Sequence, residues 1–356
     1  MDLTDTEPFD PRLAPRILIT GGSGYFGCLL RDRLRAAGAE VRIFDLLDVE
    51  DRPADVDLVR GDIRDRESVR RACAGIEVVY HNVAQVPLAK DRALFRSVNC
   101  DGTAVLLEAA RAAGVRKIVH TSSSAIFGVP LHNPVDETTA PHPREAYGEA
   151  KLAAEELIQA AVREHAMDVT IIRPRTILGH GRLGIFQILF DWVMEGRRIP
   201  LLGRGDNIYQ FVHADDLADA CVRAAASPGP AVFNIGADRF GTMRETVEAL
   251  CRHADTGSRV YSLPLRPLEL AMNATSALGL SPLGPYHALM YGRSLWFDTT
   301  RARRELGWQA RWSNEEMICE SYDWYLGHRQ ELRGSGSSAH RSPVRQGVLG
   351  LLRRIS

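Results

Sequence analysis

Residues 17–34 read ILITGGSGYFGCLLRDRL, and this stretch decides the fold of the chain. A short apolar run precedes a glycine-rich turn, and apolar residues then recur at helical spacing until Gly38. Gly21, Gly24 and Gly27 have the spacing that a phosphate-binding turn requires: a tight turn, a close approach of backbone to pyrophosphate, and close packing of helix on strand. The stretch therefore predicts a strand, turn and helix that bind a dinucleotide.

The rest of the chain repeats this alternation of strand and helix. Apolar runs typical of strands follow at 41–46, 78–80, 118–119 and 169–172, with helical stretches such as 103–113 between them. Such alternation gives right-handed crossovers and a parallel sheet. We expect an α/β fold with a doubly wound Rossmann sheet over 16–178, to which the chain returns near 205–235. Glycine and proline loosen the pattern beyond 178, which predicts a smaller, mainly substrate-binding part over 179–330.

Both ends of the chain differ in composition from its centre. Residues 1–15 are acidic and proline-rich and are expected to form a flexible arm. Residues 331–356 form a basic tail, in which 341–356 carry apolar residues at helical spacing beside arginines. That segment could touch an anionic membrane peripherally, and a frayed tail or a helix docked on a partner subunit is an equal alternative.

Bulk properties exclude several classes of function. The net charge of −1 over 356 residues gives no reason to expect a nucleic acid partner. The six cysteines lie apart, with no CxxC pair and no secretory signal peptide, so we expect reduced thiols and a cytoplasmic protein. Histidines and cysteines lack the spacing of a ligand set, and we predict no metal site.

Acidic residues at the ends of two early strands predict which dinucleotide binds. Asp45 closes the second predicted strand, where a carboxylate can accept hydrogen bonds from the adenosine ribose and would repel a 2′-phosphate. NAD is therefore favoured over NADP, although Asp45 could instead cap the following turn. Asp62 and Ile63, in RGDIRD, lie where an adenine-contacting loop is expected.

A second pattern, downstream, predicts acid/base chemistry. Tyr147 and Lys151 lie four residues apart in YGEAKLAAE, so both face the same side of a helix. An ammonium group near a phenol favours the phenolate and makes the tyrosine a usable base. The serines at 122–124 follow another predicted strand at the same sheet edge, where a hydroxyl could hold a substrate alcohol.

Taken in order, these motifs resemble the extended short-chain dehydrogenase/reductase family, which includes nucleotide-sugar epimerases, sugar dehydratases and 3β-hydroxysteroid dehydrogenases. The resemblance covers about residues 16–328 and rests on TGGSGYFG, RGDIRD, YHNVAQ, VNCDGT, TSSSAIFG, YGEAK, IIRPRTILG, FVHADDLADA and FDTTRARRELGW. It implies that Tyr147 is the acid/base, that Lys151 lowers its pKa and binds the nicotinamide ribose, and that Ser123 is the catalytic hydroxyl. Family members commonly form homodimers through helices that include the one bearing Tyr147.

The resemblance also assigns ligand-binding positions. For the cofactor NAD these are Gly21, Gly24, Tyr25, Phe26, Gly27, Asp45, Asp62, Ile63, Val83, Ala84, Asn99, Tyr147, Lys151 and Pro174. For a small-molecule substrate they are Ser124, Thr176, Arg182, Tyr209 and Gln210.

Two departures from the family narrow the reaction and the substrate. Sugar dehydratases carry an Asp-Glu pair after the catalytic hydroxyl residue, whereas this chain has Ser124-Ala125, which argues against dehydration and decarboxylation. Many nucleotide-sugar enzymes hold the substrate pyrophosphate with an arginine at the position of Tyr209. Its absence argues against a soluble UDP-sugar, unless Arg182, Arg204 or Arg293 supplies the charge.

Three hypotheses remain. The first is a sugar 4-epimerase that acts on a nucleotide-linked or lipid-linked sugar through a keto intermediate. The second is a 3β-hydroxysteroid or sterol dehydrogenase. The basic tail and the stretch 263–291 fit a lipid-linked sugar and a sterol equally. The third is an NAD-binding regulator without turnover, against which the intact set of Ser123, Tyr147 and Lys151 argues.

Overall fold

The computed structural model describes residues 16–85, 92–182, 184–278 and 285–332, so the expected arm at 1–15 and the segment 341–356 lie outside the described residues. Its centre is a seven-stranded parallel sheet in the order β11-β6-β5-β4-β1-β2-β3. The strands are β1 (Ile17–Thr20), β2 (Val41–Asp45), β3 (Asp57–Arg60), β4 (Val78–His81), β5 (Lys117–Thr121), β6 (Val169–Pro174) and β11 (Ala231–Ile235). This order confirms the predicted doubly wound Rossmann class.

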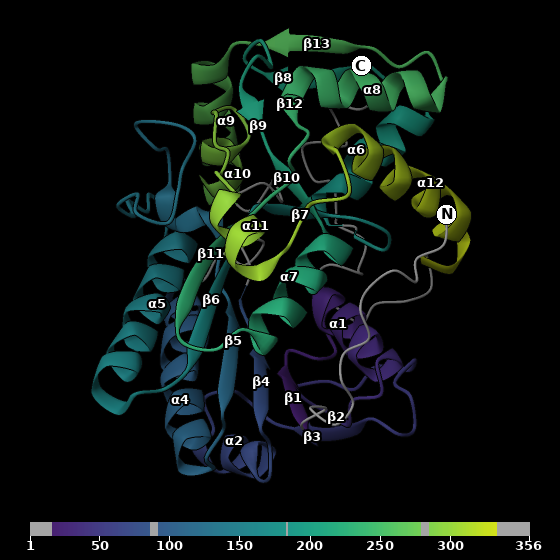
Figure 1. Cartoon of the computed structure of the whole chain (residues 1–356). Coiled ribbons are helices and arrows are strands. Elements are labelled where there is room, and N and C mark those ends of the chain that lie inside the picture. The colour runs from purple at the N-terminus through teal and green to yellow at the C-terminus, as the bar shows by residue number, and fades with distance from the viewer. Residues whose placement is uncertain (1–15, 86–91, 183, 279–284, 333–356) are drawn as a thin grey trace.

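Helices cover both faces of the sheet (Figure 1). One face carries α1 (Tyr25–Ala36), α7 (Ala214–Ala226) and α11 (Thr300–Leu306), and the other carries α2 (Arg66–Cys73), α4 (Gly102–Ala112) and α5 (Ala146–His165). Alternation along β1 explains the two layers, because Ile17 and Ile19 pack into the first core while Leu18 packs into the second. Both faces of each central strand are therefore buried.

The chain after β6 builds a second, smaller core above the carboxyl edge of the sheet. Buried side chains such as Phe190, Leu250 and Tyr322 pack together there. The helices of this part are α6 (Ile185–Met194), α8 (Met243–Ala254), α9 (Leu265–Ala277), α10 (Pro285–Met290) and α12 (Asn314–Leu332). Its strands pair two by two, as β7 (Thr176–Leu178) with β10 (Phe211–His213), β9 (Ile208–Tyr209) with β12 (Gly241–Thr242), and β8 (Ile199–Leu202) with β13 (Val260–Leu263). No helix within the described residues is long and apolar enough to cross a membrane.

Short helical segments complete the rim of the site. They are α3 (Arg92–Arg96), the π-helical turn η2 (Ser97–Asp101) and the 3₁₀ turn η3 (Ser124–Phe127).

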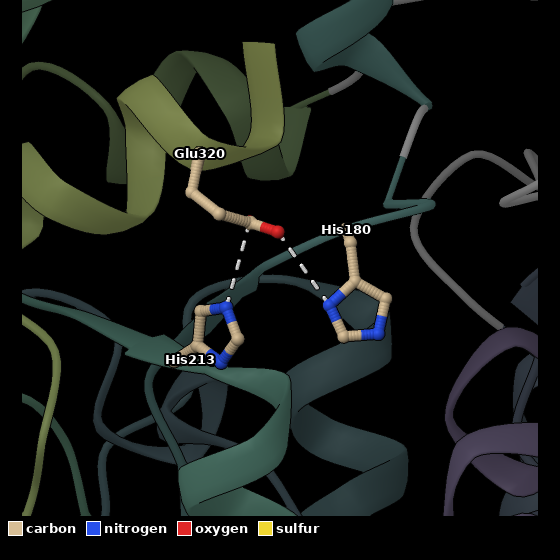
Figure 2. A group of neighbouring side chains, drawn as sticks. All are labelled: His180, His213 and Glu320. Carbon is tan, nitrogen blue, oxygen red and sulfur yellow. Dashed lines mark ion pairs between the residues drawn. The ribbon is translucent and has the colours of Figure 1, made fainter. Parts of the chain in front are cut away.

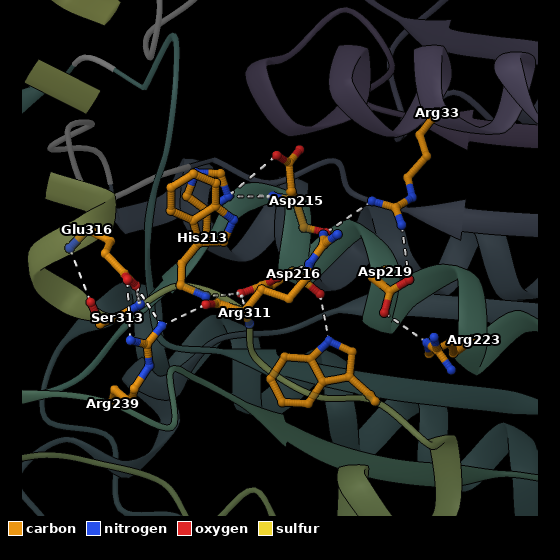
Figure 3. Close-up of polar contacts among 12 residues, drawn as sticks. Arg33, His213, Asp215, Asp216, Asp219, Arg223, Arg239, Arg311, Ser313 and Glu316 are labelled. Atoms are coloured by element: carbon orange, nitrogen blue, oxygen red, sulfur yellow. Dashed lines mark hydrogen bonds and ion pairs between the residues drawn. The ribbon is translucent and has the colours of Figure 1, made fainter. Parts of the chain in front are cut away.

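A buried carboxylate joins the smaller part to the sheet (Figure 3). Asp216, on α7, is 1% exposed and accepts hydrogen bonds from the backbone and side chain of Arg311 at 2.9 and 3.0 Å. The backbone N–H of Trp312 donates to the same carboxylate at 3.3 Å, and the indole of Trp308 donates to the Asp216 carbonyl oxygen at 2.8 Å. Because buried N–H groups need partners, this one side chain fixes the segment that leads into α12.

Replacement of Asp216 by alanine should therefore lower the free energy of unfolding by about 2–3 kcal/mol, because it leaves buried donors without an acceptor. Asp57→Ala is the matched control, since its ion pair with Arg42 lies at the surface, where such pairs contribute less than about 1 kcal/mol. Urea unfolding of both variants measures the difference. If both variants lose the same free energy of unfolding, the Asp216 hydrogen bonds do not stabilise the segment that leads into α12.

Candidate active site

The glycine-rich turn between β1 and α1 has the geometry of a phosphate cradle. Gly21 has φ +71°, which favours glycine, and a Cβ on it would lie 3.0 Å from the backbone nitrogen of Val83. A Cβ on Gly27 would lie 2.0 Å from the carbonyl oxygen of Gly21. The turn therefore holds backbone N–H groups and the start of α1 free of side chains, which is what a pyrophosphate requires.

The end of β2 supplies a carboxylate beside this turn. Asp45 accepts hydrogen bonds from the backbone N–H of Ser23 at 3.0 Å and of Leu47 at 3.4 Å, so it both braces the turn and caps the following residues. Burial raises the pKa of Asp45, and the hydrogen bond from Ser23 opposes that rise. Asp45 can therefore cap the turn and bind the ribose at the same time, because a carboxylate has lone pairs for two protein donors and for ribose hydroxyls.

These elements surround a cavity of about 500 Å³ along the carboxyl edge of the sheet. Most of the predicted cofactor residues line it: Gly21, Gly24, Tyr25, Phe26, Gly27, Asp45, Asp62, Ile63, Val83, Ala84, Tyr147, Lys151 and Pro174. The predicted substrate residues Ser124, Thr176 and Arg182 line it as well, together with Ser123. The glycine cradle and Asp45 therefore fit the adenosine and pyrophosphate of NAD at one end of a cavity that has the catalytic side chains at its other end.

The acid/base pair forms where α5 packs on the turn after β5. A Cβ on Gly148 would lie 2.5 Å from the carbonyl oxygen of Ala125, so this glycine lets the helix approach closely. Glu145 caps α5 and accepts hydrogen bonds from the backbone N–H of Tyr147 at 2.8 Å and of Gly148 at 2.6 Å. Held in this way, the Tyr147 side chain lies beside Ser123, close enough for that hydroxyl to lower the pKa of Tyr147, and both residues line the cavity.

Charges and burial around the pair set its chemistry. Burial raises the pKa of Tyr147 to about 12, while the Ser123 hydroxyl and the charge of Arg182 act in the opposite direction. Lys151 donates from Nζ to the carbonyl oxygen of Thr121 at 2.8 Å, and burial lowers the pKa of Lys151 to about 8. In this structure the charge of Arg182, more than that of Lys151, favours the tyrosinate.

Three predicted residues lie away from the cavity lining. Asn99 is buried and bonds both ways with the backbone of Gln85, at 2.6 and 3.1 Å, so it shapes the cofactor loop indirectly. The Gln210 side chain bonds with the backbone of Ala237 and Phe297. The Tyr209 hydroxyl bonds with Thr176 at 2.7 Å. Because these polar groups are already used within the protein, we do not expect direct ligand contact from them.

Two residues with polar roles in the site were not predicted from the sequence. Glu145 could have been noticed as a helix-capping carboxylate two residues before Tyr147. Arg175 lines the cavity between Pro174 and Thr176, and its Nη1 donates to Ser124 Oγ at 2.8 Å. A charged residue directly after a buried strand, at the edge where ligands bind, was its only signal in the sequence.

His180, His213 and Glu320 form a cluster (Figure 2). One nitrogen or oxygen atom of each lies within 4.8 Å of the others, and none of the three residues lines the cavity. Spacing could not reveal the cluster, because three distant segments contribute one residue each. His213 Nδ1 accepts a hydrogen bond from the backbone N–H of Asp215 at 3.2 Å, so its proton lies on Nε2, 3.6 Å from Glu320. A metal at Nε2 would have to displace that proton, so the geometry favours a cluster in which Glu320 pairs with both histidines at 3.6 Å.

The cluster predicts a pH dependence of stability. The neighbouring Glu320 carboxylate raises the pKa of His180. Burial acts to raise the pKa of Glu320, but the two histidines beside it outweigh burial and lower that pKa to about 2. The stabilisation from His180 is complete below about pH 6.5, its unfolded pKa, and is lost as pH rises through the raised folded value. We therefore expect Glu320→Gln to destabilise the protein most near pH 5–6 and progressively less above pH 7.

Urea unfolding from pH 5 to 9 measures this trend, with Glu315→Gln as the control, because Glu315 is exposed on the same helix. A destabilisation by Glu320→Gln that stays constant over that range would contradict the coupling with His180.

Comparisons with known proteins agree with this geometry. A sequence model of the NAD dependent epimerase/dehydratase family matches residues 17–236. An uncharacterized protein of Sinorhizobium fredii, y4nG, is 52% identical over 96% of this chain and 86% of its own length. A UDP-glucose 4-epimerase of Mycolicibacterium smegmatis is 30% identical over 88% of this chain and 100% of its own length. A 3-beta-hydroxysteroid dehydrogenase of Mycolicibacterium neoaurum is 30% identical over 87% of this chain and 91% of its own length.

Two solved structures share the fold at 26% identity, and each match covers 88% of this chain and 99% of the other. One is a UDP-glucose 4-epimerase of Thermotoga maritima with UDP-glucose, at a TM-score of 0.76. The other is a UDP-glucose 4-epimerase of Thermus thermophilus in complex with NAD, at a TM-score of 0.72. Because the matched residues include the glycine cradle, Ser123, Tyr147 and Lys151, the chain belongs to the NAD-dependent epimerase/dehydratase family, and NAD is its cofactor.

Proposed function

We propose that the chain is a 4-epimerase that acts on a nucleotide-linked or lipid-linked sugar through a keto intermediate. The observation that carries the proposal is that Ser123 and Tyr147 line one cavity together, while the carboxylates of its described lining, Asp45 and Asp62, lie at the adenosine end. Elimination of water would need a further acid and base beside this pair, whereas oxidation and reduction at one carbon need only the pair and the cofactor.

The chain's own groups act on one substrate hydroxyl. Ser123 holds that hydroxyl, and the Tyr147 oxygen takes its proton as the carbinol carbon loses a hydride. Bound NAD supplies the hydride acceptor and donor, and the positive charge of its nicotinamide ring favours the tyrosinate. After the keto sugar has turned its other face, Tyr147 returns the proton. Lys151, fixed on the Thr121 carbonyl oxygen, is placed to orient the ribose.

The test is to incubate the protein with candidate sugar nucleotides and NAD and to follow both the sugar products and NADH absorbance. An epimerase interconverts the two sugars without net NADH. Stoichiometric accumulation of NADH would overturn the proposal in favour of a dehydrogenase. Tight NAD binding without any product from the candidate sugars would instead favour the regulator.

A 3β-hydroxysteroid or sterol dehydrogenase is the second candidate, and the apolar wall of the cavity favours it. Ile177, Ile185 and Phe186 line the substrate side, and a relative at 30% identity is a 3-beta-hydroxysteroid dehydrogenase. The same assay with 3β-hydroxysteroids in place of sugars distinguishes the two, because only a dehydrogenase converts NAD to NADH in proportion to the alcohol oxidised.

A further inference from the structure

One buried arginine in the site lacks an acidic partner. Arg31, Arg173 and Arg175 are the buried arginines of the described residues, with exposures of 1, 4 and 2%. Arg31 pairs with Asp32 and Arg173 with Glu155. Within the same described ranges, no carboxylate lies within ion-pair distance of Arg175, and its Nη2 makes no hydrogen bond. A buried charge normally requires a counter-charge, so this guanidinium is an exception that needs a cause.

The contacts of Arg175 hold its charge in place without neutralising it. Nε donates to the carbonyl oxygen of Gln210 at 3.1 Å, and Nη1 donates to Ser124 Oγ at 2.8 Å. The guanidinium also lies over the rings of Tyr209 and Phe297, 4.7 and 5.8 Å from their centres. Neutral oxygens and aromatic faces stabilise a cation and fix its plane, yet they leave its positive charge available to a ligand.

The catalytic half of the cavity is also free of acidic groups. The only carboxylates that line the described cavity are Asp45 and Asp62, at the adenosine end. Strands β1, β4 and β5 separate β2, which ends in Asp45, from β6, after which Arg175 follows. Arg175 bonds with the residue next to Ser123, so its ligand lies beside the reacting carbon rather than at a distant diphosphate.

We propose that Arg175 binds a carboxylate on the reacting sugar ring, and that it makes the chain selective for an acidic sugar over its neutral counterpart. This inference rests on the proposed function for the position of the sugar. The planar guanidinium suits a carboxylate, and the hydroxyl of Ser124, which accepts from Arg175 and also lines the cavity, can donate to the same group.

The test compares two ligands that differ only in the group attached to ring carbon 5, which is a carboxylate in UDP-glucuronate and a hydroxymethyl group in UDP-glucose. Calorimetric titration of the NAD-loaded protein measures binding without requiring turnover. We expect the wild type to bind the acid about ten- to a hundredfold more tightly, the range for a hydrogen-bonded charge. Arg175→Met should reduce this ratio to about one, and Arg175→Lys should retain part of it.

NAD affinity, measured in the same variants, reports whether the fold is intact. Arg116→Met is the matched control for loss of a positive charge, because Arg116 is exposed and precedes β5, at the opposite sheet edge. A wild-type ratio of one or less, or no binding of either sugar, would overturn the inference, as would a preference that survives in Arg175→Met. If Arg175→Met fails to bind NAD, the test rests on the ratio of UDP-glucuronate affinity to UDP-glucose affinity in the wild type and in Arg175→Lys.

The two proposals can fail separately. Epimerisation of UDP-glucose with a binding ratio of one would retain the proposed function and reject the role of Arg175. Selective binding of the acid with net production of NADH would retain the role of Arg175 and reject the proposed epimerase function.

Discussion

Replacing Tyr147 by phenylalanine should lower kcat by about a thousandfold while NAD affinity stays within about twofold of the wild type. The substitution removes only the hydroxyl that takes and returns the substrate proton. The ring can keep its edge-to-face contact with Phe95, at 6.1 Å between centres, and its place in the first turn of α5. The loss should therefore be in chemistry rather than in folding or cofactor binding.

Steady-state kinetics and NAD titration of the same preparation test this separation. Tyr261→Phe is the matched control, because Tyr261 lies on β13 in the smaller part and its aromatic face meets Arg198 instead of the cavity. It should retain full activity. A Tyr147→Phe protein with more than about a tenth of wild-type activity would rule out Tyr147 as the acid/base.

The parts of the site that the sequence predicted are those set by local structure. A turn that needs positive φ at Gly21, followed by a helix that cannot tolerate a side chain at Gly27, is specified within a few residues. The position of Asp45 follows from strand length alone, and the Tyr147 to Lys151 spacing follows from the helical repeat. Such features are visible in one sequence because their geometry does not depend on distant partners.

The features that the sequence could not predict depend on long-range packing. Tyr209 and Gln210 are neighbours, yet one side chain contacts Thr176 and the other binds the backbone at Ala237 and Phe297. Only the pairing of β9 with β12 and of β10 with β7 determines these partners. Arg175 illustrates the same limit, because its missing counter-ion is a property of the assembled cavity.

The smaller part was predicted as a loop-rich region, and the structure shows why its elements were hard to assign. Strand β8 pairs with β13, although β9, β10, β11 and β12 lie between them in the chain. Strands β8 and β13 are each only four residues long. Short strands with distant partners lack the periodic signal of a βαβ unit. Strand β11 pairs with β6 at the edge of the main sheet.

Replacing Gly27 by alanine should have the second large effect, through the backbone rather than through chemistry. The added Cβ would lie 2.0 Å from the Gly21 carbonyl oxygen and 2.8 Å from the Gly22 Cα, so the turn or α1 must move. Overpacking of this kind costs about 1–3 kcal/mol of stability. A shift of about 1 Å at the phosphate cradle should weaken NAD binding on the order of a hundredfold.

Gly327→Ala separates this steric effect from the general effect of alanine in a helix. Gly327 lies in α12, and a Cβ there would meet nothing within 4 Å, so alanine should leave NAD affinity unchanged and raise stability by up to about 1 kcal/mol. Thermal unfolding and NAD titration of the two variants give the comparison. Unchanged NAD affinity in Gly27→Ala would mean that the close approach of α1 to the turn is not what forms the phosphate cradle.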